Sequence, residues 1–141
     1  MDVPFLLFAG GIGVLAVAGV WLLGMPLRAA RRDGVAMSLG QLIGIYLRAG
    51  DPGALVRAAS QIRRARGEAD VAMLEAHALA GGDVAAVAEA VEVEARSGGQ
   101  TPLVTLMAMD LGGYDPVRAA ASGDAGAWFN AHLLERARRT R

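Results

Sequence analysis

The sequence predicts an all-α protein: an N-terminal transmembrane helix followed by a small bundle of short helices and helical hairpins. Three observations predict this fold class. A run of twenty-five residues near the N-terminus lacks any charge, capping residues and glycines recur along the rest of the chain, and apolar residues there follow a helical period. A chain of 141 residues that is 54% hydrophobic with zero formal net charge is not disordered. The absence of cysteine excludes disulfides, thiol catalysis and cysteine-bound metals.

The uncharged run extends from Val3 to Leu27, and we assign residues 1–27 to a transmembrane helix. At about 1.5 Å per residue the run is about 37 Å long, enough for a hydrocarbon core of about 30 Å. Asp2 precedes the run and arginines follow it at once. By the positive-inside rule, the N-terminus then lies outside the cell membrane and the bulk of the chain in the cytoplasm. The residues behind this assignment are Val3, Phe5, Phe8, Trp21, Leu27, Arg28, Arg31 and Arg32.

A cleaved signal peptide is the alternative for this run, because residues 16–18 fit the small-x-small cleavage pattern. No basic residue precedes the run, however, and its apolar character continues well past Ala18. We therefore favour an uncleaved membrane helix.

Residues 28–49 form a basic, apolar juxtamembrane segment. Its apolar part, Val35 to Leu47, has thirteen residues and is too short to span a bilayer. Arginines flank it on both sides, which suits contact with an anionic inner leaflet. An interfacial segment, a re-entrant segment and a first core helix remain open for this stretch.

Residues 50–122 are predicted to form an alanine-rich helical domain, and residues 123–141 a C-terminal helix with an arginine-rich end. Capping side chains precede proline at Asp51, Thr101 and Asp115, and Asp70 and Asp83 are further N-cap candidates. Glycines supply the helix ends. The expected helices cover residues 52–66, 71–80, 84–97, 102–111, 116–122 and 125–140.

Apolar residues at helical spacing mark the expected buried faces of these helices. The alternation of apolar and acidic residues from Val91 to Glu94 is typical of a strand, but it is too short to overturn the helical pattern. We assign Glu89, Glu92 and Glu94 to the wet face of an amphipathic helix. The three apolar stripes comprise Leu55, Ala59 and Ile62; Val71, Leu74 and Ala78; and Val84, Val87, Val91 and Ala95.

Charge is segregated along the chain and argues against nucleic-acid binding. The net charge is +5 over residues 1–66, −8 over residues 67–124 and +3 over residues 125–141. Affinity for a phosphate backbone scales with the phosphates neutralised, so a net-neutral chain is a poor nucleic-acid binder. We interpret the arginines near the C-terminus as a solvated helix end.

Candidate chemistry centres on the two histidines, His77 and His132. Glu75 and His77 point about 200° apart around a helix, so they cannot share a ligand on one face. A pair of His77 with the distant Asp110 is conceivable, but we favour a packing histidine and a capping aspartate. No catalytic triad, zinc motif or phosphate-binding loop is present, so we predict no catalytic, cofactor-binding or metal-binding residue.

One stretch resembles a known family. From Met73 to Val91 the chain reads M-L-E-A-H-A-L-A-G-G-D-V-A-A-V-A-E-A-V. This is similar to the L-E-x-H-x-L-A-G-G-[ND]-V-x-x-V-V-x-A pattern of bacterial flotillin-like proteins of the FloA type. Residues 42–48 and 108–117 resemble flanking segments of that family in the same order, so the resemblance covers about residues 1–120. The motif-like residues are Leu74, Glu75, His77, Leu79, Ala80, Gly81, Gly82, Asp83, Val84, Asp110, Leu111 and Gly112.

The resemblance implies a non-catalytic, self-associating membrane scaffold of the inner face, linked to ordered lipid microdomains. Its expected partners are the lipid bilayer and either further copies of this chain or a flotillin-like or NfeD-like protein, with no cofactor. Members of the family continue into an SPFH (band 7) domain and a coiled coil, whereas this sequence turns after Ala121 to a short helix. We therefore expect a form without those regions. The alternative is a small membrane-bound enzyme or transporter accessory subunit that uses His77 and nearby acids.

The charge asymmetry around the apolar run predicts a topology. A reporter fused to the C-terminus should be active only if the reporter works inside the cell. Activity of a periplasmic-type reporter at that position would contradict the orientation, and release of the protein by alkaline extraction would contradict membrane insertion.

Overall fold

The computed structural model describes residues 51–139 without interruption, together with residues 21, 24–25, 27–35, 38, 40 and 43–44. Among these residues all regular structure is helical and none belongs to a strand, which confirms the all-α fold class. Residues 21, 24, 25 and 27–32 are helical and come first. The helices that follow are α3 (Pro52–Arg66), α4 (Val71–Leu79), α5 (Val84–Ser97), α6 (Leu103–Leu111), α7 (Pro116–Ala121) and α8 (Ala125–Arg139).

The expected transmembrane helix lies largely outside the described residues, and with it Val3, Phe5 and Phe8. Among the residues that are described, we find no helix with the length and apolar character needed to cross a bilayer. The spanning assignment therefore stays a prediction. The same holds for most of the apolar segment 35–47, of which the structure describes a buried Val35, a 41% exposed Ile43 and three small residues.

Local side-chain caps explain where the helices begin. One oxygen of Asp51 accepts the backbone N–H of Ala54 at 3.0 Å, and one oxygen of Asp83 accepts that of Ala85 at 2.9 Å. Asp70 and Asp115 cap α4 and α7 in the same way. The predicted boundaries are therefore correct to within one residue at every helix. Thr101 is the exception among the expected caps, because its buried N–H donates to Glu94 instead.

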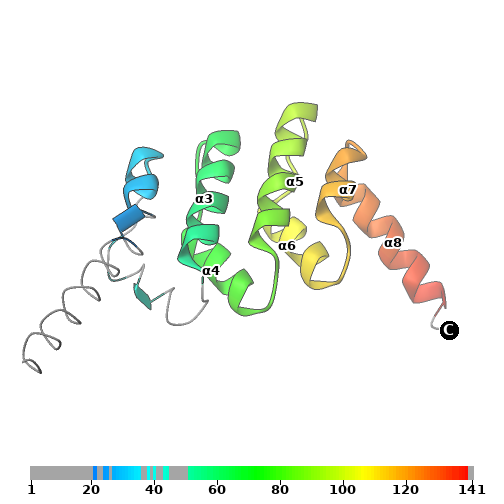
Figure 1. Cartoon of the computed structure of the whole chain (residues 1–141). Coiled ribbons are helices and arrows are strands. Elements are labelled where there is room, and N and C mark those ends of the chain that lie inside the picture. The colour runs from blue at the N-terminus through cyan, green and yellow to red at the C-terminus, as the bar shows by residue number, and fades with distance from the viewer. Residues whose placement is uncertain are drawn as a thin grey trace, which may run out of the picture.

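The helices stack as antiparallel pairs in two layers (Figure 1). α3, α5 and α7 stand side by side in the first layer, with α5 packed between the other two, and α4, α6 and α8 form the second layer. The caps Asp51, Asp83 and Asp115 begin the three pairs at intervals of 32 residues. We call these pairs repeats 1, 2 and 3. Each repeat contacts mainly its neighbours, which is the architecture of α-helical solenoids.

Small side chains line the core between the repeats. Leu55, Val87 and Ala119 occupy equivalent positions of the three repeats, and none is more than 1% exposed. The side chain at this position becomes smaller from repeat 1 to repeat 3. Ala30 and Val35 belong to the same core, and Arg63 of α3 donates a hydrogen bond to the carbonyl of Gly34. The helical stretch at 27–32 therefore packs on α3.

Two sequence assignments on α5 are wrong. Glu94 is 2% exposed and lies inside the protein, not on a wet face, while Glu89 is exposed as expected. Ala95, assigned to the apolar stripe, is exposed. The helix is flanked by α3 and α7, so its buried surface is broader than a single stripe, and it includes the position of Glu94.

An aromatic cluster closes the C-terminal end of the stack. The ring of Tyr114 meets Trp128 and Phe129 of α8 edge-to-face, with centroid distances of 6.3 and 5.4 Å. The ring of His132 stacks on Trp128 at 3.7 Å. α7 has only six residues, and these ring contacts join α8 to the turn that precedes α7.

The turn after α4 forms where the sequence predicts it. Gly81 has a φ of +88°, which a side chain disfavours, and its N–H donates to the carbonyl of Ala78 at 3.0 Å. The N–H of Gly82 donates to the carbonyl of His77, which completes a Schellman motif. Gly113 and Tyr114 repeat this geometry after α6.

Replacing Gly81 with Val should lower the free energy of unfolding by about 1–2 kcal/mol, because a β-branched side chain is strained at this φ. Urea unfolding of a fragment covering residues 50–141 measures the loss. Ala80→Val, one residue earlier at an ordinary φ, is the control. Equal losses in the two variants would contradict the left-handed geometry.

Candidate functional site

The flotillin-like motif residues lie at the junction between repeats 1 and 2. They cover the end of α4, the glycine turn and the start of α5, and Asp110 to Gly112 end α6. Leu74 and Val84 are buried in the core, whereas Leu79 is 51% exposed. Leu74, Val84 and His77 are the buried positions of the motif, and its other residues are half-buried or exposed.

His77 and Asp110 come together across the two repeats. Nε2 of His77 lies 2.9 Å from Oδ2 of Asp110, a close polar contact without the alignment of a hydrogen bond. The same oxygen accepts the backbone N–H of Asp83 at 2.7 Å. Asp110 therefore joins the end of α6 both to α4 and to the first residue of repeat 2.

The glycine pair of the motif is fitted to this histidine. A Cβ atom at Gly82 would overlap Cε1 and Nε2 of the His77 ring. Gly81 supplies the left-handed turn, and Gly82 supplies the space for the imidazole. We call His77, Gly82, Asp83 and Asp110 the histidine clasp.

The histidine clasp is largely enclosed by the protein. The side chain of His77 is 2% exposed and that of Asp110 is 15% exposed, so a substrate has little access to either group. In the part of the chain that the structure describes, no three His, Asp or Glu side chains gather to hold a metal ion. Glu75, the polar residue of the motif outside the clasp, is half-buried on another side of α4.

A second buried polar group links the repeats at the other end of the helices. Oε2 of Glu94 lies 2.9 Å from Nη2 of Arg66 on α3 and accepts the N–H of Thr101 at 3.0 Å. Sequence reasoning missed this group, because it placed Glu94 in solvent. The available signal was the 32-residue repeat, which aligns Glu94 with the apolar Ile62, a core position.

The second layer carries most of the exposed apolar side chains and is grooved. Met73 on α4, Val104 on α6 and Leu134 on α8 are 39%, 60% and 61% exposed. We call these three side chains the apolar face. An open groove of about 710 Å³ separates α6 from α8, and its lining includes Val104, Thr105, Asp124, Phe129 and Asn130. A smaller hollow between α4 and α6 adjoins Met73 and Val104. Such a surface is typical of a contact site for another protein.

The described topology residues lie before α3. Trp21 is 67% exposed, Leu27 is half-buried, and Arg28, Arg31 and Arg32 are exposed.

Comparison of the chain with protein-family models, with curated proteins and with solved structures found no match. The family resemblance therefore rests on the quoted motifs alone.

Introducing a methyl group at Gly82 tests the close contact between this residue and the His77 ring. Gly82→Ala should destabilise the fold by about 1–3 kcal/mol, because the new Cβ meets the buried imidazole. In a His77→Ala background the same substitution should cost little, since the ring is gone. Urea unfolding of the four proteins in this cycle measures the coupling, and additive losses would contradict the contact.

His77→Gln and His77→Ala test the structural role of this residue. The glutamine variant keeps the approximate volume and a polar end, so the fold should remain nearly intact, whereas the alanine variant leaves Asp110 with one partner fewer and should melt modestly earlier. Zinc titration is the control measurement. Stoichiometric zinc that binds the parent but neither variant would contradict the structural role and revive the enzyme alternative.

Proposed function

We propose that this chain is a non-catalytic, membrane-anchored scaffold that self-associates through its second layer. The observation that carries the proposal is the apolar face, Met73, Val104 and Leu134, beside the groove between α6 and α8. Exposed apolar side chains on adjacent helices favour a protein contact over free solvent. The uncharged run from Val3 to Leu27 supports an anchor in the cell membrane with the helical repeats on the cytoplasmic side.

The buried position of the only motif histidine supports a scaffold rather than an enzyme. A general acid or base must reach its substrate within hydrogen-bond distance, and the ring of His77 is enclosed by the glycine turn and Asp110. The resemblance to flotillin-like proteins adds the organisation of membrane microdomains to the proposal. A flotillin-like or NfeD-like protein is the alternative partner for the same apolar face.

Self-association should depend on the apolar face. The detergent-solubilised parent should run well above its 14.5 kDa monomer mass, and Val104→Glu with Leu134→Glu should shift it to smaller species, because each charge is costly in a dry interface. Size-exclusion chromatography with light scattering measures this mass. Ala85→Glu, an exposed substitution on α5 in the first layer, should leave the size unchanged.

A parent protein that is monomeric at all concentrations would contradict the self-association. Equal effects of the Val104/Leu134 variant and the Ala85 variant would contradict the assignment of the contact to the second layer.

A further inference from the structure

The stack has two chemically different edges. The helices of the first layer run in the same direction, so their C-terminal ends meet at one edge, the upper edge of Figure 1. The lower edge holds the ends of α4 and α6 and the turns at residues 80–83 and 112–115. These two edges face opposite ways along the helix axes.

Exposed leucines lie at the lower edge. Leu79 and Leu111 close α4 and α6 at equivalent repeat positions, 32 residues apart, and are 51% and 50% exposed. Each leucine is followed by a glycine turn without a basic residue. Two neighbouring repeats therefore present the same large apolar side chain at the same height of the stack.

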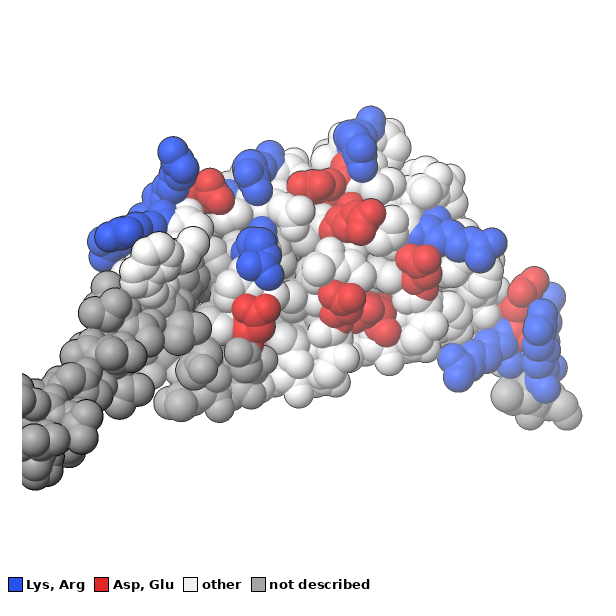
Figure 2. Space-filling view, viewed as in Figure 1, with Lys and Arg blue, Asp and Glu red and all other residues white. Residues whose placement is uncertain are grey.

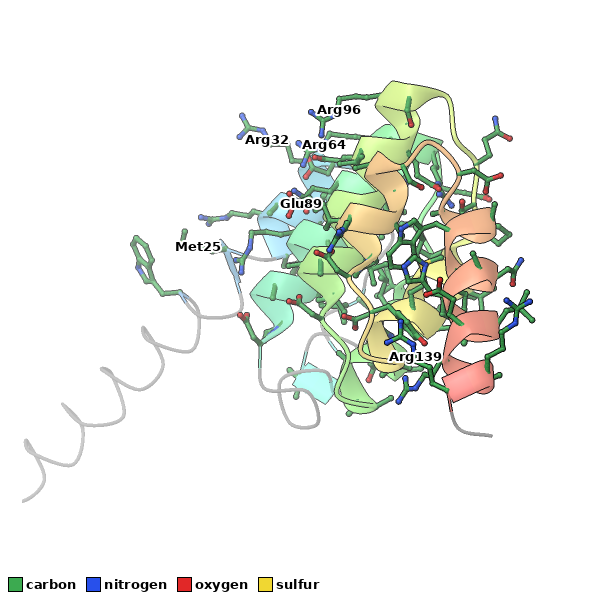
Figure 3. The ribbon with its side chains drawn as sticks, turned by 90° about the vertical axis from the view of Figure 1, so that its right-hand side faces the viewer. Met25, Arg32, Arg64, Glu89, Arg96 and Arg139 are labelled. Carbon is green, nitrogen blue, oxygen red and sulfur yellow. The ribbon has the colours of Figure 1, made fainter. Side chains whose placement is uncertain are left out.

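The first described helical residues lie before α3. Residues 27–32 pack on α3 and rise toward the upper edge, so that Met25 lies below Arg32 (Figure 3). Trp21 and Met25 are 67% and 59% exposed. In the sequence, these two residues belong to the uncharged run that begins at Val3.

Arginines mark the opposite edge. Arg32, Arg64 and Arg96 follow one another at intervals of 32 residues, and all three are exposed. Figure 3 shows them together at the upper edge, above Glu89, and Figure 2 shows basic side chains spaced along that edge. These three repeated arginines mark the upper edge of the stack, whereas Arg139, at the end of α8, lies low in the same view.

We propose that the lower edge rests on the surface of the bilayer, with Leu79 and Leu111 in the interfacial region and the arginine edge turned toward the cytoplasm. This inference rests on the proposed membrane anchor. The continuity of the chain supports a lipid occupant, because the apolar run leads to the exposed Trp21 and Met25, and tryptophan favours the headgroup depth. A leucine side chain transferred from water into this region stabilises the contact.

The acidic caps limit the depth and the lipid preference of the contact. Asp51, Asp83 and Asp115 begin the first-layer helices at the lower edge, where their carboxylates accept backbone N–H groups. Carboxylates do not enter the hydrocarbon, so the leucines reach only the boundary between headgroups and acyl chains. The contact should form on neutral phosphatidylcholine, and anionic lipid should not strengthen it.

The absence of native cysteine allows a direct test on the full chain. Ala80→Cys places a single label beside Leu79 at the lower edge, and Ser97→Cys places one beside Arg96 at the upper edge; both parent residues are exposed. Each labelled protein is reconstituted in phosphatidylcholine vesicles with or without lipid that carries a quencher at a shallow acyl position. The label at position 80 should be quenched strongly, and the label at position 97 should be nearly unchanged.

Substituting the leucines tests the cause of this quenching. Leu79→Gln with Leu111→Gln should shift the contact equilibrium by roughly tenfold for each leucine and weaken the quenching at position 80. Ala95→Gln, an exposed substitution near the C-terminal end of α5 and outside the apolar face, is the control and should leave the quenching at position 80 unchanged.

Three outcomes would overturn the inference. Equal quenching of the two labels would contradict a preference of the bilayer for the lower edge. Shielding of the label at position 80 that persists in detergent and is lost on dilution would assign the edge to a second copy. Quenching that requires anionic lipid would indicate that arginines, and not the leucines, bind the bilayer. Alkaline extraction tests the membrane anchor independently of the edge contact. Release of the chain would contradict both proposals. A chain that stays in the membrane but shows no quenching at position 80 would contradict only the edge contact.

Discussion

The close contact of α5 with α3 and α7 is the constraint on which the rest of the structure depends. Ala88, Ala90 and Val91 are fully buried, and their small side chains let α5 approach its neighbours on both flanks. Each such residue buries little area, at about 25 cal/mol per Å², so stability requires the contacts to repeat along the stack. Repetition at a fixed interval then sets the positions of both edges and of the second layer.

The two buried polar groups hold the second layer in register with the first. Glu94 ties the end of α5 to Arg66 and to the start of the following loop, and Asp110 ties the end of α6 to α4 and α5. They act at opposite ends of the helices. Hollows remain between α4 and α6 and between α6 and α8, and the contact of His77 with Asp110 joins α4 to α6.

Helix boundaries could be predicted from the sequence because they depend on neighbouring residues. An Asp before a helix and a glycine after it make their hydrogen bonds within one turn, so Asp83 and Gly81 were correctly assigned from spacing alone. The pairing of His77 with Asp110 joins residues far apart in the chain and was only one of two alternatives. Glu94 was misplaced for the same reason, since its partner Arg66 lies on another helix.

The 32-residue interval was the non-local signal that the sequence did contain. It relates Asp51, Asp83 and Asp115, and it aligns Leu79 with Leu111. Recognising it would have predicted the two layers and the burial of Glu94. It would not have predicted the shortened α7, because the third repeat departs from the interval within this first helix.

The uneven distribution of aromatic residues places the two tryptophans where each can report on a different end of the protein. No aromatic residue occurs between Tyr46 and Tyr114, so the two tryptophans lie toward opposite ends of the described body. Trp128 is enclosed by Tyr114 and His132, and its emission depends on the docking of α8, whereas the exposed Trp21 responds to the surroundings of the first helix. Because a stack of repeats can open from either end, intrinsic fluorescence can distinguish which end separates first.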